Sequence, residues 1–305
     1  MSVVYHHSGL DVLARTLDGV RAQVPPVHAT RVLVNDATGT ERDAVRSLLG
    51  GDGEVVAHDA NLGFAGGQNA NAAALFAAGA DAVLVLNPDV RLAPDAVAGL
   101  AAYAAGRAVL AGPLLLGATR PGLDPDGTID SAGIRWTATA RHLDDRQGEP
   151  ASAAPTQPAL VPGLTGACLL VPRAAYERIV AATGELFDQD FFAYREDAEL
   201  GLRAAVLGVP SYVVPAAAGW HARGSAGTSR TTSAFANSLG VQNRFLIAFK
   251  YGRRRPGRPL ARAARDIVVV AGVLLRERTS IPGLRTAWRL RGRMREKRRA
   301  LFGAA

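Results

Sequence analysis

The chain has 305 residues, of which 48% are hydrophobic and 20% are charged, so it can bury a substantial core and is not an intrinsically disordered protein. Its net charge of +8 comes from the C-terminus, because residues 253–305 hold 16 Arg or Lys against three acidic residues and residues 1–252 sum to −5. A mildly acidic body argues against a nucleic-acid-binding domain, and we expect no nucleic-acid partner.

Cysteine content and hydropathy indicate the compartment. Cys168 is the only cysteine, which excludes an intrachain disulfide and a cysteine-based zinc site and favours a reducing cytoplasm. The N-terminal residues MSVVYHHSG lack a charged leader followed by a long apolar run. The longest apolar run near the C-terminus, residues 267–275, is far shorter than the ~20 residues of a membrane-spanning helix. We therefore expect a cytoplasmic protein without a transmembrane helix.

Strands and helices alternate along the first hundred residues. The predicted strands are apolar and run directly into polar residues: 3–5, 31–34, 54–58 and 82–86. Helical spacing or an Ala-rich composition marks the predicted helices: 10–20, 66–79 and 93–105. This alternation predicts an α/β fold with a Rossmann-like, mostly parallel central sheet, flanking helices and right-handed crossovers. In such sheets ligands bind beyond the carboxyl ends of the strands.

The rest of the chain is less regular. Residues 118–160 are rich in Gly, Pro, Asp and Thr and lack periodicity, which predicts a long, mobile loop or hairpin region. Order returns at 166–171, and the later predicted elements are helices at 172–182, 196–207 and 234–250 and a closing strand at 211–214. The pattern of 258–302 predicts one or two amphipathic helices. We expect an α/β domain over residues 1–252 and a basic helical tail over 253–305.

Asn87-Pro88-Asp89 directly follows the buried strand 82–86. A carboxylate at that point, on a backbone stiffened by proline, is suited to bind Mg²⁺ or Mn²⁺ together with diphosphate oxygens. Asn-Pro-Asp is also strong turn chemistry, and taken alone it is more simply interpreted as a turn.

Acidic residues begin the predicted helix 196–207, after an aromatic run that ends at Tyr194. Glu196 and Glu199 are equally well explained as helix-capping residues. Asp197 beside aromatic side chains is different, because burial raises the proton affinity of a carboxylate and suits it to act as a general base on a sugar hydroxyl.

Two loops complete the candidate site. In the loop after the closing strand, His221 has small neighbours that allow close approach to a metal or a diphosphate, and Arg223 and Arg230 are suited to neutralise phosphate charge. A lone histidine is more often structural. The segment NLGFAGGQN, from Asn61 through Gly66 to Asn69, lacks the G-x-G-x-x-G spacing and predicts a loop-to-helix corner whose amides approach a nucleotide. A purely structural corner is the alternative.

Seven segments together resemble family-2 glycosyltransferases of the GT-A type, most closely their rhamnosyltransferase-like branch. They are VVYHHSGLDVLARTLDGV, LVNDATGT, NLGFAGGQNAN, VLVLNPDV, GACLLVPRAAYERI, GELFDQDFFAYREDAELGLRAAVLG and GWHARGSAGTSR. They cover roughly residues 3–250, in the order of the family and near its spacing. One such motif is weak, but seven in order make coincidence implausible.

The resemblance implies an inverting single displacement from a nucleotide-diphosphate sugar, carried on dTDP or UDP, with a divalent metal bridging the diphosphate. Asp89 stands at the last metal-binding Asp of a D-x-D-like motif, whose first position is Asn87 here. His221 matches a position that reaches the metal or diphosphate. Asp197 matches the catalytic base, and Asp36 matches an acidic pair that contacts the base or ribose.

Two departures from the family affect the nucleotide pocket. The first strand ends Tyr5-His6-His7-Ser8 where relatives usually have a Thr-Tyr-Asn-like end, and the second gives Asn35-Asp36 where Asp-Asn or Asp-Asp is common. The donor therefore stays open, with dTDP-rhamnose as the first candidate. The alternatives are a catalytically inactive relative, a non-catalytic sugar-nucleotide-binding protein and a nucleotidyltransferase. The last would carry a basic Gly-rich signature after the first strand, which this sequence lacks.

The tail mixes Arg with apolar residues that include Trp288 and Phe302. This pattern predicts that residues 253–305 lie on the anionic, cytoplasmic face of the cell membrane, beside a glycan or lipid-linked acceptor in polysaccharide or cell-wall synthesis. The alternative is a basic helix pair that packs on the domain or forms the contact of a homodimer.

Overall fold

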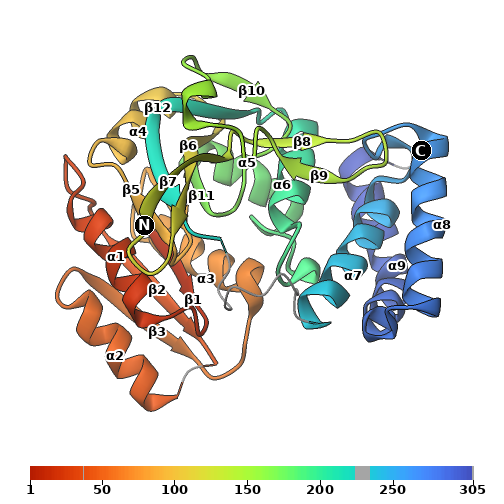
Figure 1. The fold of residues 1–305 in the computed structure, drawn as a ribbon, viewed down its shortest axis with the longest axis horizontal. Helices are drawn as coiled ribbons and strands as arrows, with labels where there is room; N and C mark the ends of the chain where they lie inside the picture. Colours follow the sequence, from red (N-terminus) through yellow and green to blue (C-terminus); the bar gives the residue numbers. More distant parts are fainter. Residues whose placement is uncertain (37, 224–233, 304–305) are drawn as a thin grey trace.

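The computed structural model describes residues 1–36, 38–223 and 234–303. Its central feature is a mixed sheet that runs through the molecule (Figure 1). The strands on its main path are β1 (Ser2–Tyr5), β2 (Thr30–Asn35), β3 (Gly53–His58), β4 (Ala82–Leu86), β6 (Leu110–Thr119), β10 (Ala159–Val161), β11 (Cys168–Pro172) and β12 (Ser211–His221). Their order is β10-β12-β6-β11-β4-β1-β2-β3. All run in one direction except β10 and β11, so the sheet is mostly parallel, as predicted.

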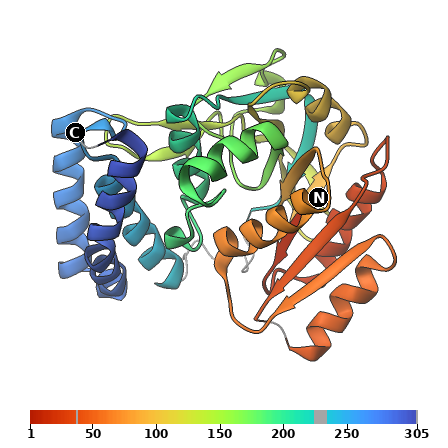
Figure 2. The same ribbon diagram turned by 180° about the vertical axis from the view of Figure 1, so that it is seen from behind.

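Helices cover both faces of this sheet because its strands are apolar on both sides. Leu84 and Leu86 of β4 join one core, whereas Val83 and Val85 join the other, as the two-residue period of a strand requires. The first core includes α1 (Leu10–Arg21), α2 (Gly39–Leu49) and α4 (Ala96–Ala104). The second includes α3 (Gly63–Ala77), α5 (Arg173–Thr183) and α6 (Glu196–Val206), and Figure 2 shows this face with α3 in orange and α5 in green.

The region 118–160 is more ordered than the sequence predicts. After β6 the chain forms β7 (Asp124–Ser131), which pairs with β6, and then the hairpin of β8 (Ile134–Trp136) and β9 (His142–Asp144). The hairpin interpretation is confirmed and that of a long loop is wrong. Short strands interrupted by register shifts leave no two-residue period to detect in the sequence.

Two further strands and one strand end were missed. The central strand β6 carries Gly112, Pro113 and Gly117, which weaken its strand signal, and β5 (Val90–Leu92) is only three residues long. Strand β12 continues seven residues beyond the predicted end at 214, through a register shift between Val214 and Ala218. This extension brings His221 to the end of the sheet.

The predicted C-terminal amphipathic helices are α8 (Pro259–Leu275) and α9 (Ile281–Phe302), which stand with α7 (Ala234–Tyr251) at the right of Figure 1. Helix α9 packs on α7, where Met294 and Ala287 are buried against Leu246 and Ile247. Of α8, only Arg262 and Val273 are buried. No helix among the described residues is long and apolar enough to cross a membrane.

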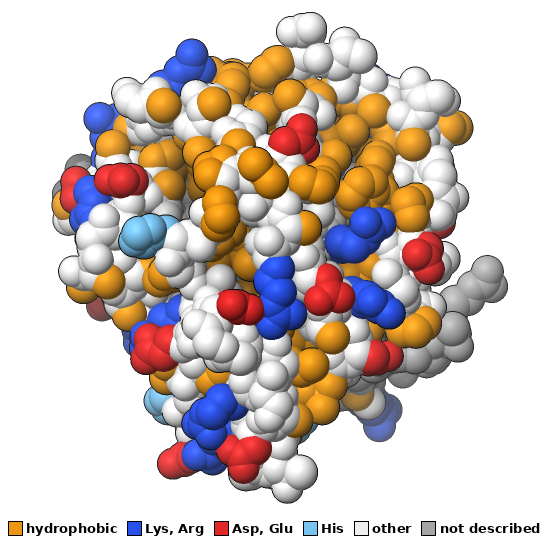
Figure 3. All heavy atoms as spheres, turned by 90° about the vertical axis from the view of Figure 1, so that its left-hand side faces the viewer, with side chains coloured by type: hydrophobic (Ala, Val, Ile, Leu, Met, Phe, Trp, Pro, Cys, Tyr) orange, Lys and Arg blue, Asp and Glu red, His pale blue; other side chains and the backbone are white. Residues whose placement is uncertain are grey.

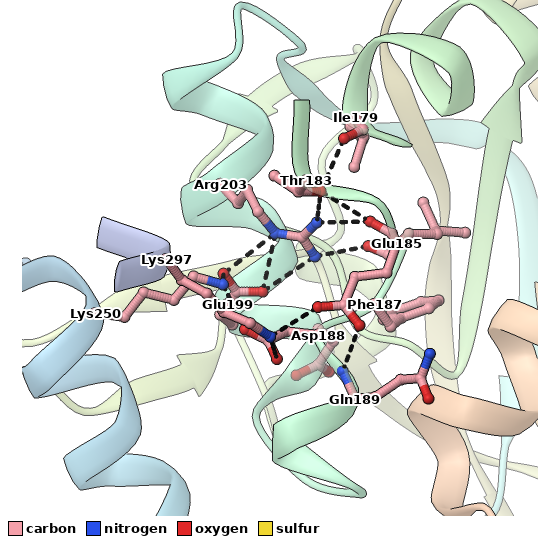
Figure 4. Close-up of polar contacts among 12 residues, drawn as sticks. Ile179, Thr183, Glu185, Phe187, Asp188, Gln189, Glu199, Arg203, Lys250 and Lys297 are labelled. Atoms are coloured by element: carbon pink, nitrogen blue, oxygen red, sulfur yellow. Dashed lines mark hydrogen bonds and ion pairs between the residues drawn. The ribbon is translucent and has the colours of Figure 1, made fainter. Parts of the chain in front are cut away.

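A buried ionic cluster also ties α9 to the α/β domain (Figure 4). Asp188, which is fully buried, lies 2.5 Å from Nζ of Lys250 on α7 and 2.6 Å from Nζ of Lys297 on α9. Nζ of Lys250 also lies 2.7 Å from Oε1 of Glu199 on α6. The other carboxylate oxygen of Glu199 pairs with Arg203 at 3.2 Å. The C-terminal helices are therefore joined to the segment that carries the start of α6.

Candidate active site

A cavity of about 790 Å³ opens at the carboxyl ends of the strands that run in the common direction. His6 follows β1, Asn35 ends β2, and His221 ends β12. Predicted site residues from four separate segments line this cavity: Asn61, Asn87, Asp89, Asp197, His221 and Arg223. Residues as far apart in the sequence as Asn61 and Arg223 are thereby brought into one site.

Gly66 and Asn69, which were predicted for the nucleotide site, do not line this cavity. Both line a separate hollow of about 350 Å³ between α3 and the segment 184–189. The Asn69 side chain accepts from the backbone N–H of Phe187 at 2.8 Å and donates to its carbonyl at 2.8 Å. Asn69 therefore joins α3 to the segment before α6, as the structural interpretation of this half of the corner expects.

Asp36 also lies outside the residues that line the cavity. It is exposed at the end of β2, and its carboxylate is within 4.8 Å of ring nitrogens of His6 and His7. Because His6 does line the cavity, Asp36 stands at its rim on the β1–β2 side. Ser225 and Arg230 lie outside the described residues.

Residues 61–63, the first half of the Gly- and Asn-rich corner, form a turn that leads into α3, as predicted. The Asn61 side chain accepts from the backbone N–H of Gly63 at 2.8 Å and contacts Nε2 of His6 at 2.8 Å. Asn35 holds the same turn, accepting from the N–H of Leu62 at 3.1 Å. Gly63 has φ of +69° and sits against the Phe192 carbonyl, so a side chain there would be both strained and blocked.

Asp89 and His221 face each other across the wall of the cavity. Oδ1 of Asp89 lies 3.4 Å from Nε2 of His221, and Oδ2 of Asp89 accepts from Arg120 at 2.7 Å. On its other side, His221 Nδ1 lies 2.8 Å from Oδ2 of Asp130 on β7. Burial alone would lower the pKa of His221, but the two carboxylates outweigh it and raise the pKa to about 9. Burial opposes ionisation of Asp89 too, yet His221 and Arg120 lower its pKa.

Arg223 extends this chain of charges towards α6. It donates to both carboxylate oxygens of Asp130 and, at 2.5 Å, to Asp144 on β9. Burial disfavours the charged form of Arg223, but Asp130 and Asp144 raise its pKa. Asp130, Asp144 and Arg120 were missed from the sequence because they lie in the region interpreted as an irregular loop, and only the paired strands bring them to the site.

The pair Asp89 and His221 fits a divalent cation that displaces the proton from Nε2 of His221. Oδ1 of Asp89 is buried and accepts no hydrogen bond from any residue in the described part of the chain. Two neighbouring ligands of an octahedral Mg²⁺ or Mn²⁺, each at about 2.1 Å, stand about 3 Å apart, close to the 3.4 Å between Oδ1 and Nε2. The donor set of a carboxylate and an imidazole suits a transition metal such as Mn²⁺.

Asp197 and Glu196 begin α6 on another wall of the same cavity. Asp197 accepts from the N–H of Gly166 at 3.1 Å and of Ala198 at 2.7 Å. Burial raises the pKa of Asp197, and these backbone hydrogen bonds and Arg223 only partly offset the effect. Burial, followed by repulsion from Asp197, raises the pKa of Glu196 well above its usual value. A carboxylate with raised proton affinity at the wall of a cavity is suited to accept a proton near neutral pH.

The loop before α6 is held by Asn243 of α7. Phe192, Tyr194 and Arg195 have φ of +62°, +66° and +67°, a backbone conformation that residues other than glycine rarely adopt. The buried amide of Asn243 donates to the carbonyls of Phe191 and Ala193, both at 2.9 Å, and of Tyr194 at 2.6 Å. These three bonds fix the path that delivers Asp197 to the cavity.

Comparisons with known proteins agree with this architecture. A family model described as glycosyltransferase like family 2 matches residues 3–244. A curated relative is the N-acetylglucosaminyl-diphospho-decaprenol L-rhamnosyltransferase of Mycobacterium tuberculosis (strain CDC 1551 / Oshkosh), 29% identical over 231 residues, which are 63% of this chain and 71% of the relative. The same enzyme of strain ATCC 25618 / H37Rv matches equally.

Two solved structures share the fold. GalNAc-T7 with UDP, GalNAc and Mn²⁺ superposes with a TM-score of 0.60 at 16% identity, over 83% of this chain and 48% of that one, so the chain spans about half of its length. S. aureus TarS 1-349 gives a TM-score of 0.53 at 13% identity, over 99% of this chain and 89% of that one. These likenesses concern the fold, which is that of the GT-A glycosyltransferases. With a family model that spans most of its length, the chain belongs to the glycosyltransferase-like family 2 and is a family-2 glycosyltransferase.

Proposed function

We propose that the protein transfers a sugar, with inversion, from a nucleotide-diphosphate sugar to a hydroxyl of a glycan or lipid-linked acceptor in cell-wall or polysaccharide synthesis. The observation that carries this proposal is a single cavity with Asp89 and His221 on one wall and Asp197 on another. One pair is suited to hold a metal and a diphosphate, and the other carboxylate is suited to accept a proton. An inverting displacement needs these two functions on opposite sides of the reacting carbon.

In this reaction Asp197 takes the proton of the acceptor hydroxyl as its oxygen attacks the anomeric carbon, and the bond from that carbon to the diphosphate breaks. Asp130 and Arg223 hold His221 in place during the step. When bound by Asp89 and His221, a divalent cation supplies charge neutralisation for the leaving diphosphate. His6, Asn61 and Asp36 lie on the β1–β2 side of the site, and Asn87 follows the neighbouring strand β4. We propose that the nucleotide binds there.

The donor and the metal are proposed by analogy. The curated relative is named as an L-rhamnosyltransferase, and we propose dTDP-rhamnose as the first donor and a UDP-sugar as the second. The solved structure of GalNAc-T7 contains UDP and Mn²⁺. With the donor set of Asp89 and His221, this favours Mn²⁺ over Mg²⁺.

The test is a thermal-shift panel of nucleotide diphosphates and their sugars, each with and without Mn²⁺ or Mg²⁺. A ligand that binds only the folded state raises its stability by RT ln(1 + [L]/Kd), so a true donor raises the Tm in a metal-dependent way. The shift is expected with one nucleotide and is expected to disappear in Asp89→Ala. If no nucleotide diphosphate shifts the Tm with either metal, the proposal fails.

The cellular location is also proposed. The relative acts, by its name, on a diphospho-decaprenol substrate, which is lipid-linked. A basic pair of helices beside the site supports a peripheral position on the cytoplasmic face of the membrane, with residues 253–305 at the lipid surface.

A further inference from the structure

The cavity of the active site extends beyond Asp197 to the C-terminal helices. Arg244 of α7, Arg265 and Val269 of α8 line it together with Asp197. Arg195, which directly precedes the acidic pair of α6, and Arg141, in the β8–β9 turn, line the same end. We call Arg141, Arg195, Arg244 and Arg265 the arginine cluster.

The arginine cluster has little negative charge to balance it. Arg244 pairs with Asp266 at 2.7 Å. Arg141, Arg195 and Arg265 form no ion pair with any residue that the structure describes. Of the other carboxylates that line the cavity, Asp144 pairs with Arg223 at 2.5 Å and Glu277 accepts a hydrogen bond from Ser280 at 2.7 Å. Within the described part of the chain, three guanidinium groups therefore face a cavity with no protein anion bound to them.

The pKa values of Arg195 and of the neighbouring His142 also indicate unbalanced positive charge in the cluster. Burial and then the neighbouring cations Arg244 and Arg141 lower the pKa of Arg195 to about 10. Burial, Arg195 and Arg141 lower the pKa of His142 to about 4, so this imidazole is neutral at pH 7. Arginine side chains that repel one another across a cavity are stabilised by an anion between them, and guanidinium groups bind phosphate oxygens in a bidentate manner.

The proposed base lies close to arginines of both groups. Asp197 lines the cavity together with Arg223, which belongs to the Asp89–His221 wall, and with Arg195 of the cluster, and it interacts electrostatically with both. We infer that the base can serve a donor diphosphate at the first wall and an acceptor at the arginine cluster. A second diphosphate bound there would belong to the acceptor.

Helix α8, which supplies Arg265, presents an uncharged apolar face to solvent. Leu260, Ile267 and Leu275 are 86%, 69% and 77% exposed. Val268 and Leu274 are exposed as well, and the spacing of these five residues places them on one side of the helix. Arg258 and Arg276 flank this face at the two ends of α8. An exposed apolar face with arginines at its borders is suited to an anionic bilayer surface.

We propose that the arginine cluster binds the diphosphate of a lipid-linked acceptor, and that the apolar face of α8 lies in the bilayer that holds its lipid chain. This inference rests on the proposed glycosyl transfer and names its acceptor class. The acceptor sugar then projects from the cluster towards Asp197. The cavity of about 790 Å³ is within the ~300–1,000 Å³ range of ligand pockets, at its upper part, as needed for two substrates.

The first test uses farnesyl diphosphate as the probe, below its aggregation concentration and without vesicles, with binding measured by calorimetry. The double variant Arg141→Gln/Arg265→Gln removes two exposed members of the cluster, and Arg285→Gln, an exposed arginine of α9 outside the cavity, is the matched control. We expect at least a tenfold weaker Kd for the double variant and no change for the control. Equal Kd values for all three proteins would overturn the assignment.

A competition experiment separates this inference from the proposed function. Farnesyl diphosphate should still bind when the donor site is filled with UDP or dTDP and Mn²⁺, and the double variant should bind that nucleotide as the wild type does. If the nucleotide displaces the probe, the probe occupies the donor site and the acceptor assignment is wrong. If no nucleotide binds at all, it is the proposed function that fails.

The bilayer contact is tested with vesicles of phosphatidylglycerol and phosphatidylcholine. Ile267→Ser/Leu274→Ser should reduce co-sedimentation several-fold and leave farnesyl diphosphate binding in solution unchanged. Leu160→Ser, which alters an equally exposed leucine on β10, is the control and should pellet as the wild type does. Equal pelleting of all three proteins would show that α8 does not contact the bilayer.

Discussion

Nδ1 of His221 lies 2.8 Å from Oδ2 of Asp130, so a carboxylate on strand β7 orients the imidazole whose other nitrogen faces Asp89. The contact joins the end of β12 to strand β7, about ninety residues earlier in the chain. A partner of this kind fixes the ring and its tautomer and so determines which nitrogen is offered to a metal.

We expect Asp130→Asn to weaken Mn²⁺ binding by about 10–100-fold, the usual effect of losing a partner of a metal-binding histidine. Mn²⁺ titration followed by electron paramagnetic resonance measures this without activity. Asp124→Asn alters an exposed carboxylate of the same strand and serves as the control. Unchanged Mn²⁺ affinity in Asp130→Asn would contradict the positioning role.

The acidic limb of the pH profile should report Asp197. A general base works when deprotonated, so kcat/KM should rise with pH through a pKa above the ordinary ~3.9 of aspartate, because burial raises the pKa of Asp197. Arg223 lowers that pKa, so Arg223→Gln should move the limb to higher pH. A limb at the ordinary value that does not move in Arg223→Gln would argue against Asp197 as the base.

Asn243→Ala should reduce kcat, because Asn243 holds the loop that leads to Asp197. The variant removes the side-chain donor of three carbonyls in the loop 191–194, of which that of Phe191 keeps the N–H of Ala193, at a cost of about 1–3 kcal/mol of stability. The loop should then relax and misplace Asp197, so kcat should fall while donor binding is retained. Retention of full kcat despite the lower Tm would show that the loop does not position the base.

Lys250→Met should destabilise the protein by about 3–5 kcal/mol, because it leaves Asp188 and Glu199 buried without their shared cation (Figure 4). Arg46→Met, at an exposed ion pair of α2, is the control and should cost about 0–1 kcal/mol. Chemical denaturation measures both. Similar losses would mean that the cluster contributes no more than a surface pair.

The same cluster gives a pH dependence of stability. Burial opposes ionisation of Asp188, but Lys250 and Lys297 outweigh it and lower its pKa to about 2. Because the folded-state pKa is below the unfolded value of ~3.9, this contribution is fully present above pH ~4 and is lost as the pH falls towards 2. The free energy of unfolding should fall less steeply in this range in Lys250→Met. An identical pH dependence in the variant would contradict this source of stability.

Lys297 and the packing of α9 on α7 connect the predicted tail, residues 253–305, to the rest of the chain. Removing residues 253–305 would remove Lys297 and the face of α9 that packs on α7, so we expect this truncation to lower the Tm strongly. Scanning calorimetry of the truncated chain tests the division, and a Tm equal to that of the full chain would establish residues 1–252 as an independent domain.

Figure 3 shows the face of the molecule that lies away from the C-terminal helices, on the left-hand side of Figure 1. Acidic and basic side chains are interspersed on it, consistent with the confinement of the net positive charge to the C-terminus.

The sequence predicted those parts of the molecule whose signal is local. Strand β4 and the helices α1, α5, α6 and α7 have clear periodicity or capping and appear within a few residues of their expected limits. Asp89 and Asp197 were predicted as site residues because they stand just after β4 and at the start of α6, and His221 because it stands in a Gly-rich segment after the predicted closing strand. The charged partners of these residues could not be found in this way. Asp130 and Arg120 lie near Asp89 only because β7 pairs with β6 and β6 pairs with β12, and such long-range pairings leave no trace in the local pattern.

Asn69 differs from Asn61 in where its side chain lies. Its place in a Gly- and Asn-rich corner favoured nucleotide binding, but Asn69 lies inside α3 and its side chain bonds to Phe187 in the segment before α6. The arginine cluster was likewise hidden, because its four members come from β8–β9, the start of α6, α7 and α8.

The most direct test of the central claim compares Asp197→Asn with the wild type in transfer and in donor binding. If Asp197 is the general base, the rate of transfer should fall by about 10²–10⁴-fold, while the Kd of the nucleotide-sugar with Mn²⁺, measured by calorimetry, stays within a factor of two or so. Transfer at a rate near that of the wild type would contradict the account. So would an equal loss of donor binding, because the role of Asp197 would then lie in holding the donor.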